Sequence, residues 1–472
     1  MLDCGRPTGD APETGDSGMK VAITGATGFI GKRIAAHLLG MGHAVVALSR
    51  DGERAARLLP ARCRIVAWDP ANGRMAPGVL DGVDAVVNLA GAGVADGRWT
   101  ARRKEAIRGS RIDGTRAVVD AIGALPAERR PRVLLSASAV GYYGDRGDAV
   151  LNERSEPGSG FLAEVCQAWE RAALAAEGLG VRTVVVRVGI VLGRGGALAR
   201  ILPPFRLGLG GRIGGGGQWM SWIHLDDLVA LFAFALDHAD VRGAVNGVAP
   251  RPVTNLEFTR MLARTLGRPA LLPVPSLPLK IALGEMAGVL LEGQRVVPEV
   301  AERSGFRFRH PDLDGALAEI TCDPATTLEM EQWVPQPPEE VFPFFADAYN
   351  LERITPPFLK FRILAVSTPT LQTGTRIDYR LSLHGVPVRW QSLIEDWEPN
   401  RSFVDTQTRG PYHRWHHTHE FEPDRGGTII RDRVRYELPL GALGSVVAGG
   451  FVAKDVNKIF GFRYAKIREI FG

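Results

Sequence analysis

The chain has few of the features that mark membrane-spanning or nucleic-acid-binding proteins. No apolar run reaches the roughly eighteen uninterrupted residues that a membrane span needs. The net charge of +5 is spread over 472 residues without a dense block of lysine and arginine. That charge therefore indicates solubility rather than binding to nucleic acid or to a membrane surface.

Cysteine is also scarce. The four cysteines, Cys4, Cys63, Cys166 and Cys322, lie far apart, with no Cys-x-x-Cys pair and no histidine at metal-ligand spacing around them. This pattern predicts free thiols in a cytoplasmic protein, and no metal site.

The chain is too long for one ordinary core, and its composition changes near residue 322. The first 18 residues are polar and rich in glycine and proline, without the apolar core of a signal peptide, and predict a disordered leader, with Met19 as an alternative start. Of the 35 Phe, Trp and Tyr residues, 20 lie after position 326. Turn-forming residues in Thr321-Cys-Asp-Pro-Ala-Thr326 suggest a linker at 319–327, between domains at 19–318 and 328–472.

Short Val/Ile/Leu runs alternate with helical patterns before that linker. The runs at 20–24, 44–48, 85–89, 132–136 and 183–188 are typical of buried parallel strands, and the segments 31–39, 111–122 and 163–176 are typical of helices. This βαβαβ order predicts an α/β Rossmann fold with a doubly wound parallel sheet.

The first strand runs directly into Gly25-Ala-Thr27-Gly28-Phe29-Ile30-Gly31 and then into an amphipathic helix. Gly25 allows a tight turn, Gly28 lets the backbone approach a pyrophosphate, and Gly31 lets the helix pack on the sheet. The helix then points its first amides at the phosphates. We expect residues 25 and 27–31 to bind a dinucleotide.

The residues after the next two strands refine this expectation. The second strand ends in Ser49 and Arg50, where an NAD-preferring domain would present a carboxylate to the ribose, and Arg50 could pair with a 2′-phosphate instead. The alternative is a solvated Arg50 with no ligand. The third strand ends in Asn88-Leu89-Ala90-Gly91, a turn of small residues where a nucleotide would lie. The expected cofactor is NADP(H).

These motifs resemble those of the extended short-chain dehydrogenase/reductases, within the NAD-dependent epimerase/dehydratase superfamily. The segment Ser221-Trp-Ile-His-Leu-Asp-Asp227 belongs to the same resemblance. Further segments narrow it to an atypical epimerase-like family: Ser138-Ala-Val-Gly-Tyr-Tyr-Gly144, Phe161-Leu-Ala-Glu-Val-Cys166 with Trp169-Glu170, Arg187-Val-Gly-Ile-Val-Leu-Gly193, Phe205-Arg-Leu-Gly-Leu-Gly-Gly211 and Asn246-Gly-Val-Ala-Pro250. The resemblance covers nearly all of residues 19–318. It implies a substrate lobe in the second half of that region and cofactor contacts at Ser49, Arg50, Leu89, Ala90 and Arg111.

The catalytic residues of that superfamily are only partly present. Its members usually combine a Ser or Thr with a Tyr-x-x-x-Lys pair, in which the lysine lowers the pKa of the tyrosine. Ser138 fits the first role, but Leu162 and Cys166 occupy the positions of the pair. Tyr142 is a candidate substitute, although a packing role is the alternative, and His224 is a candidate acid or base with a structural alternative.

The segment 328–472 resembles the START-related (SRPBCC, polyketide cyclase/dehydrase-like) superfamily of α+β helix-grip folds. The resemblance rests on Trp333-Val-Pro-Gln-Pro-Pro-Glu-Glu-Val-Phe342, Asn350-Leu-Glu-Arg-Ile-Thr-Pro-Pro357, Gly426-Gly-Thr428 and a closing helix at 444–470. It implies an apolar cavity for a hydrophobic ligand. Candidates to line the cavity, or simply to fill the core, are Trp390, Phe403, Tyr412, Trp415 and Phe421.

Histidines gather in one expected strand of this second domain. At period two, His413, Trp415, His417 and His419 share a face and His416 lies on the other. No carboxylate or cysteine nearby in the sequence completes a metal set, so a structural or pocket-polar role is expected.

Three functions remain open on the sequence. The first is an NADP(H)-dependent oxidoreductase or epimerase-like enzyme acting on a small, hydrophobic or carbonyl-containing substrate, fused to a domain that binds a related ligand. The second is a non-catalytic NADP(H)-binding sensor, favoured by Leu162 and Cys166. The third places cyclase or dehydratase activity in the C-terminal domain.

Overall fold

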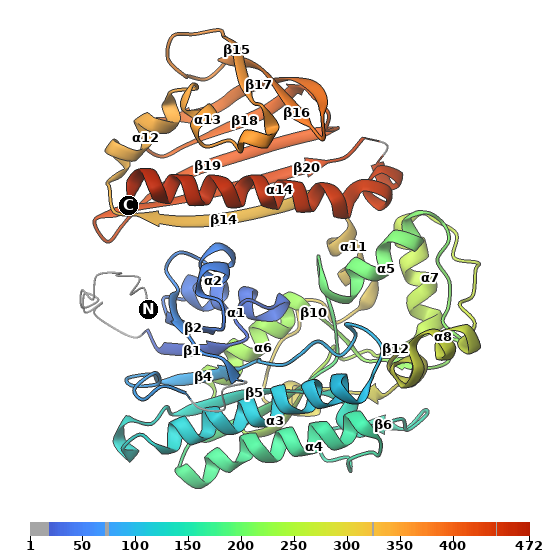
Figure 1. Cartoon of the computed structure of the whole chain (residues 1–472). Helices are drawn as coiled ribbons and strands as arrows, with labels where there is room; N and C mark the ends of the chain where they lie inside the picture. Colours follow the sequence, from blue (N-terminus) through green and yellow to red (C-terminus); the bar gives the residue numbers. More distant parts are fainter. Residues whose placement is uncertain (1–17, 71–74, 323–324, 440) are drawn as a thin grey trace.

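The computed structural model describes residues 18–70, 75–322, 325–439 and 441–472, which contain two seven-stranded sheets (Figure 1). The expected leader lies outside these described residues, except for Gly18, and so do residues 323 and 324 of the expected linker. Within the described part of the chain, no helix is both long and apolar enough to cross a bilayer.

The first sheet is parallel, in the order β11-β7-β5-β4-β1-β2-β3. Its strands are β1 (Lys20–Thr24), β2 (Ala44–Ser49), β3 (Arg64–Ala67), β4 (Ala85–Asn88), β5 (Val133–Ala139), β7 (Arg182–Val188) and β11 (Gly243–Gly247). The strand order reverses beside β1, so the carboxyl ends of β1 and β4 form the switch point where such folds bind nucleotides. The predicted Rossmann-type fold is confirmed.

Helices cover both faces of this sheet. One apolar core joins the sheet to α1 (Phe29–Gly40) and α6 (Leu225–Asp237) through residues such as Leu38 and Phe232. A second core joins the opposite face to α3 (Ala101–Gly123) and α4 (Phe161–Leu174) through residues such as Ile122 and Ala173. The two cores make the sheet doubly wound.

The second half of this region adds short elements beside the carboxyl edge. Its paired strands are β6 (Val150–Leu151) with β13 (Arg295–Val296), β8 (Ile190–Leu192) with β10 (Trp222–His224), and β9 (Trp219–Met220) with β12 (Val253–Thr254). Its helices are α5 (Gly196–Arg206), α7 (Asn255–Leu266), α8 (Ser276–Leu283), α9 (Gly288–Leu291), α10 (Glu299–Arg303) and α11 (Leu313–Thr321).

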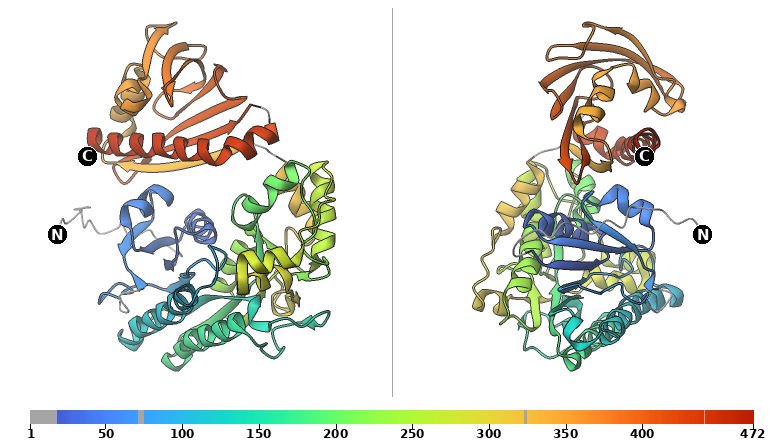
Figure 2. Two further views of the ribbon diagram at one scale, coloured as in Figure 1. Left: turned by 45° about the vertical axis from the view of Figure 1, so that its right-hand side comes forward. Right: turned by 90° about the vertical axis from the view of Figure 1, so that its left-hand side faces the viewer.

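The second sheet is antiparallel, in the order β14-β20-β19-β18-β17-β16-β15. Its strands are β14 (Thr326–Val334), β15 (Arg362–Val366), β16 (Arg376–Leu383), β17 (Val386–Glu398), β18 (Ser402–Arg409), β19 (Arg414–Asp424) and β20 (Gly427–Glu437). The helices are α12 (Pro338–Ala346), α13 (Asn350–Arg353) and α14 (Gly441–Phe471). The sheet curves over α14 (Figure 2), which confirms the expected helix-grip arrangement.

Several element ends differ from the sequence expectations, because strand pairing decides them. β5 extends to Ala139, since its ladder with β7 continues to the pair Ala139↔Val188. β14 begins at Thr326, within the expected linker, since Thr326 already pairs with Tyr436. Side-chain patterns alone do not show where a ladder stops.

The two sheets meet through α2 (Gly52–Leu58) and the loop that follows it. The amide of Ala61 donates to Glu331 at 3.0 Å, and Arg62 pairs with Glu422 at 2.7 Å and with Asp424 at 3.1 Å. The hydroxyl of Tyr464 on α14 lies 3.5 Å from the carbonyl oxygen of Ala56. Figure 1 shows α2 directly beneath β14 and α14.

Candidate functional site

The turn between β1 and α1 has no room for side chains at its glycines. Gly25 has φ +67°, and a Cβ there would lie 2.8 Å from the carbonyl group of Leu89. A Cβ at Gly31 would lie 2.4 Å from the carbonyl oxygen of Gly25. Gly28 precedes α1 without a side-chain cap, so the first amides of the helix are available to an anion. This cradle fits a pyrophosphate.

A buried hydrogen-bond network fixes the two strand ends beside the cradle. The Thr24 hydroxyl donates to Asn88 at 2.7 Å and accepts from the amides of Leu89 and Ala90 at 3.0 and 3.2 Å. Asn88 in turn donates to Thr115 on α3 at 2.8 Å. The loop 89–91 is therefore held against Gly25, which brings these predicted cofactor residues together.

Arg111 lies under the same loop. Its guanidinium donates to the carbonyl oxygens of Ala92 and Ile107 at 2.9 and 3.1 Å, and a Cβ at Gly91 would lie 3.2 Å from its Cζ. Burial lowers the pKa of Arg111. The side chain thus supports the loop and places a positive charge beneath it.

The remaining predicted cofactor residues lie around the same edge. Thr27 and Ile30 are half-buried, and the Ile30 side chain packs on the core below α1, so its amide is the part that can reach a ligand. Phe29 packs against the chain at 193–196, where a Cβ at Gly195 would lie 2.9 Å from its ring. The side chain of Phe29 is thus a spacer between α1 and the second half of the domain.

Basic side chains surround the end of β2. Arg50 is exposed, and the carboxylate of Asp51 accepts from the amide of Arg54, capping α2. Burial, and then the nearby charge of Arg54, lower the pKa of Lys32. The chain therefore offers Arg50, Arg54 and Lys32 for a phosphate group, and the sequence analysis missed the last two because they lie on separate helices.

The predicted catalytic Ser138 belongs to a buried polar network. Its hydroxyl donates to Glu170 on α4 at 2.6 Å, and Glu170 pairs with Arg187 on β7 through two contacts of 2.8 and 2.9 Å. Arg187 also donates to the hydroxyl of Tyr143 at 2.9 Å, and Tyr143 donates to Asn246 at 2.7 Å. Burial raises the pKa of Tyr143 to about 12, so its phenol stays protonated at neutral pH.

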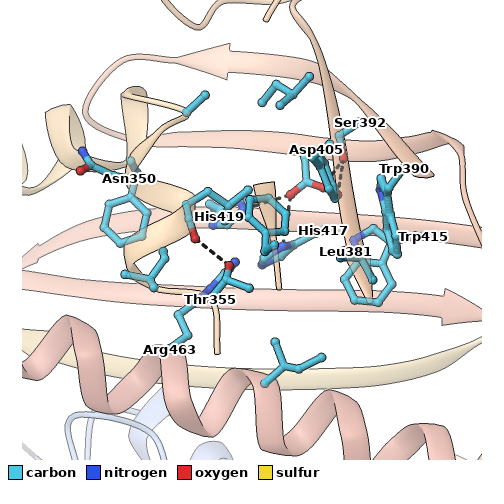
Figure 3. A pocket seen from close by; sticks show the side chains of 18 of the residues that line it. Asn350, Thr355, Leu381, Trp390, Ser392, Asp405, Trp415, His417, His419 and Arg463 are labelled. Carbon is cyan, nitrogen blue, oxygen red and sulfur yellow. Dashed lines mark hydrogen bonds and ion pairs between the residues drawn. The ribbon is translucent and has the colours of Figure 1, made fainter. Parts of the chain in front are cut away.

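The C-terminal domain contains a cavity of about 150 Å³ between its sheet and α14 (Figure 3). Four of the five predicted aromatic residues line it: Trp390, Phe403, Tyr412 and Trp415. The expectation for Phe421 is wrong, because its ring packs in the core against Phe342 and Phe345.

Two histidines and two aspartates form a compact cluster in the wall of this cavity. His417 on β19 lies opposite Asp405 on β18, and His419 lies opposite Asp432 on β20. His417 contacts the two carboxylates at 3.2 and 2.8 Å, and His419 contacts them at 3.2 and 3.0 Å.

The sequence expectation that no carboxylate completes the histidine set is therefore wrong. Asp405 and Asp432 come from the two flanking strands, so sequence distance hid them. Asp405, His417 and His419 are of metal-ligand type and close enough to share an ion. These side chains pair with one another, which agrees with the expected pocket-polar role, although Nδ1 of His419 lies 3.0 Å from Asp432 without forming a hydrogen bond with a described residue.

Opposite shifts within this cluster predict a pH dependence. Burial opposes charge on His417, but hydrogen bonds to Asp405 and Asp432 outweigh it and raise the pKa of His417. Burial likewise opposes charge on Asp432, but bonds from the two histidines outweigh it and lower the pKa of Asp432. The interaction of charged His417 stabilises the folded domain in full below the unfolded pKa of about 6.5, and this stabilisation is lost as pH rises through the folded pKa. The aspartate term is present above about pH 3.9 and is lost as pH falls.

We therefore expect β19 and β20 to open more readily at pH 8.5 than at pH 5.5. Hydrogen exchange of their peptides, corrected for intrinsic rates, measures the opening free energy. His417→Gln should reduce the difference between the two pH values. Equal opening free energies at both pH values would contradict this assignment of charge.

Comparison with known proteins connects this geometry to a family. Residues 21–246 match the NAD dependent epimerase/dehydratase family. The epimerase family protein SDR39U1 homolog, chloroplastic, of Arabidopsis thaliana is 45% identical over 308 residues, which are 65% of this chain and 87% of the relative. The chain belongs to this epimerase family. The family protein ML0860 of Mycobacterium leprae is 41% identical over 307 residues, 65% of this chain and 96% of the relative.

A solved structure of the family supports the fold assignment. The crystal structure of human epimerase family protein SDR39U1 (isoform 2) with NADPH is 37% identical, has a TM-score of 0.57, and covers 64% of this chain and 99% of the human chain. Residues 274–320 match a domain of unknown function, DUF1731. Residues 334–460 match the polyketide cyclase/dehydrase and lipid transport family, which confirms the resemblance predicted for the C-terminal domain.

In this epimerase family member, Leu162 and Cys166 stand where the extended short-chain dehydrogenase/reductases usually have Tyr and Lys. Leu162 and Cys166 lie on α4 beside Gly141, and the Cys166 thiol interacts with Ser138, so the position of the missing pair holds one apolar side chain and one thiol. Burial, and then Glu170, raise the pKa of Cys166 to about 11, which leaves a neutral thiol at pH 7. Tyr142 lies over Arg187, 3.5 Å from its Cζ to the ring centre.

The polar residues of the segment 221–227 are engaged in structure in this family member. His224 caps α6 by accepting from the amide of Asp226 at 3.2 Å and stacks on His310 at 4.0 Å between ring centres. Burial, and then the neighbouring His310, lower its pKa. Asp227 accepts from two backbone amides at 2.8 and 2.9 Å. These contacts favour the structural alternative for His224.

Proposed function

We propose that residues 19–318 bind NADP(H), with the pyrophosphate in the glycine cradle and the 2′-phosphate beside Arg50. The observation that carries the proposal is the cradle itself, which a Cβ at Gly25 or Gly31 would fill. The human relative crystallised with NADPH supports it. The M. leprae relative supports a domain of this length, because 307 residues of this chain match 96% of that relative.

Arg50 provides the test of cofactor preference. We expect Arg50→Glu to weaken NADPH binding about 10- to 100-fold, because a charge-assisted pair with the 2′-phosphate is replaced by repulsion. NADH affinity should change little. Calorimetric titration of both cofactors measures these affinities. Arg57→Glu, at an exposed position of α2, is the matched charge control. Equal losses for NADPH and NADH would contradict the proposed role.

We further propose that the domain is an oxidoreductase or epimerase-type enzyme acting on a small molecule. Bound NADP(H) supplies or accepts the hydride. Ser138 and Tyr142 are the proposed acid/base and orienting residues. Ser138 donates to Glu170, whereas the Tyr142 hydroxyl makes no hydrogen bond with any described residue and is the better placed to hold a substrate oxygen or pass it a proton.

Hydride transfer tests this part of the proposal. The full chain is incubated with 4-deuterated NADPH and a panel of carbonyl compounds, and deuterium in the product is measured by mass spectrometry. Tyr142→Phe should reduce transfer while leaving NADPH affinity unchanged. No transfer to any compound by a chain that binds NADPH would favour the sensor alternative, which the apolar Leu162 and neutral Cys166 also support.

The C-terminal domain is proposed to bind a hydrophobic small molecule in its cavity. The apolar and aromatic lining supports this proposal. The third alternative is cyclase or dehydratase chemistry in this domain. The cluster of His417, His419 and the two aspartates in the cavity wall provides polar groups for it. A cytoplasmic location is proposed from the free thiols of Cys63, Cys166 and Cys322.

A further inference from the structure

One charged side chain in the C-terminal cavity has no counterion among the described residues. Arg463 on α14 lines the cavity and is 8% exposed. Its Nε and Nη1 atoms are buried without a hydrogen-bond partner in the described part of the chain. Figure 3 shows its side chain rising from α14 toward the sheet. The guanidinium carbon lies 5.0 Å from the centre of the Phe460 ring. This cation–π contact offsets only part of the cost of burying a charge without a counterion, so a compensating anion is still needed.

The acidic groups that line or flank the cavity do not supply that compensation. Asp347 accepts from the amide of Tyr349 at 3.0 Å and forms no ion pair with Arg463 in the described part of the chain. Asp405 and Asp432 each contact both His417 and His419, so both carboxylates are already paired. Tyr379 does not supply an anion either. Burial, and then the charge of Asp405, raise the pKa of its phenol well above its ordinary value, although the charge of Arg463 opposes this shift. The positive charge of Arg463 is therefore left for a molecule that enters the cavity.

The rest of the lining indicates what that molecule looks like. Apolar side chains surround the space: Leu351 on α13, Ile354 directly after it, Leu371 in the loop between β15 and β16, and Leu381 on β16. The single uncompensated charge of Arg463 requires one negative charge on the ligand. A carboxylate meets this requirement, and its oxygens match guanidinium donors in geometry.

We propose that the C-terminal cavity binds an apolar molecule that carries a single carboxylate, with the carboxylate paired to Arg463 and the apolar body against the sheet. This inference rests on the proposed function of the domain as a hydrophobic-ligand site, and it adds the chemical class of the ligand. The His417 and His419 cluster remains a separate wall of the cavity and is not the anion site.

The test compares two probes of equal chain length, octanoate and 1-octanol, by calorimetric titration of the delipidated full chain. We expect octanoate to bind at least tenfold more tightly than 1-octanol. Arg463→Gln should weaken octanoate binding by about 10- to 100-fold, the range of a charge-assisted hydrogen bond, and leave 1-octanol binding unchanged. Arg468→Gln, on the exposed side of the same helix, is the matched control and should change neither.

The outcomes separate this inference from the function on which it rests. If both probes bind equally, or if Arg463→Gln does not affect octanoate, the carboxylate assignment is overturned while the hydrophobic site stands. If neither probe binds, the proposed ligand-binding function fails, and the inference fails with it.

Thermal unfolding gives a second readout that does not need a ligand. Because Arg463 is buried without a counterion, and its Nε and Nη1 atoms lack hydrogen bonds to described residues, Arg463→Met should raise the melting temperature of the ligand-free chain. A lower melting temperature would show that the folded protein already compensates this charge, and would overturn the inference.

Discussion

Gly31→Ala is expected to abolish measurable NADPH binding, with a loss of at least about 100-fold in affinity. The new Cβ would lie 2.4 Å from the carbonyl oxygen of Gly25 and 2.8 Å from the Cα of Ala26. Both are backbone atoms, so no side-chain rotation can relieve the overlap. The start of α1 must move away from the turn, and its first backbone amides then no longer point at the pyrophosphate.

The same substitution should also destabilise the N-terminal domain, by about 1–3 kcal/mol, as overpacking in a tight core commonly does. Gly40→Ala is the matched control because it lies at the end of the same helix and its Cβ would meet no atom within 4 Å. This control should be neutral, or more stable by up to about 1 kcal/mol. Calorimetric NADPH titration and urea unfolding measure both variants, and normal binding by Gly31→Ala would contradict the cradle.

Glu170→Gln is expected to give the largest loss of stability, about 3–5 kcal/mol. Glu170 and Arg187 have side chains that are 7% and 5% exposed, and the substitution leaves the guanidinium of Arg187 buried without its carboxylate. Glutamine keeps the size of the side chain and an acceptor for Ser138, so the loss reports the missing charge rather than a cavity.

The measurement is urea unfolding, with hydrogen exchange of α4 and β7 peptides to assign the transition to this domain. Asp113→Asn is the control, because the ion pair of Asp113 with Arg116 is exposed and should contribute less than about 0.5 kcal/mol. Replacing both Glu170 and Arg187 with leucine should recover part of the loss. If Glu170→Gln lost no more unfolding free energy than Asp113→Asn, the charge of Arg187 would have to be compensated by water or by a rearrangement of the structure around it, which would contradict this prediction.

The sequence predicted those parts of the site whose geometry is local. Residues 25–31 form one turn, and their spacing alone specifies the tight bend and the close helix packing. Arg50 could be placed for the same reason, since it directly follows a strand. The resemblance to known families supplied the substrate lobe and the helix-grip domain, which no local pattern specifies.

What the sequence analysis missed is assembled by tertiary contacts. Glu170 and Arg187 meet across α4 and β7, and Asn88 reaches Thr115 on a helix that begins 13 residues after β4 ends. A signal for Asp432 was present, because it alternates with Ile430 and Val434 on the buried face of one strand. A carboxylate at such a position is rarely without a partner, and the partner strand carries the histidines.

The contact between α2 and α14 has a thermodynamic consequence. α2 starts directly after Arg50, and its Ala56 carbonyl lies 3.5 Å from the hydroxyl of Tyr464, the residue next to Arg463. A direct contact between α2 and α14 therefore connects the proposed nucleotide site with the proposed carboxylate site. If occupancy of one site shifts this contact, linkage requires the affinities to change by the same factor in both directions. The redox cofactor would then report on the cavity ligand, and the ligand on the cofactor.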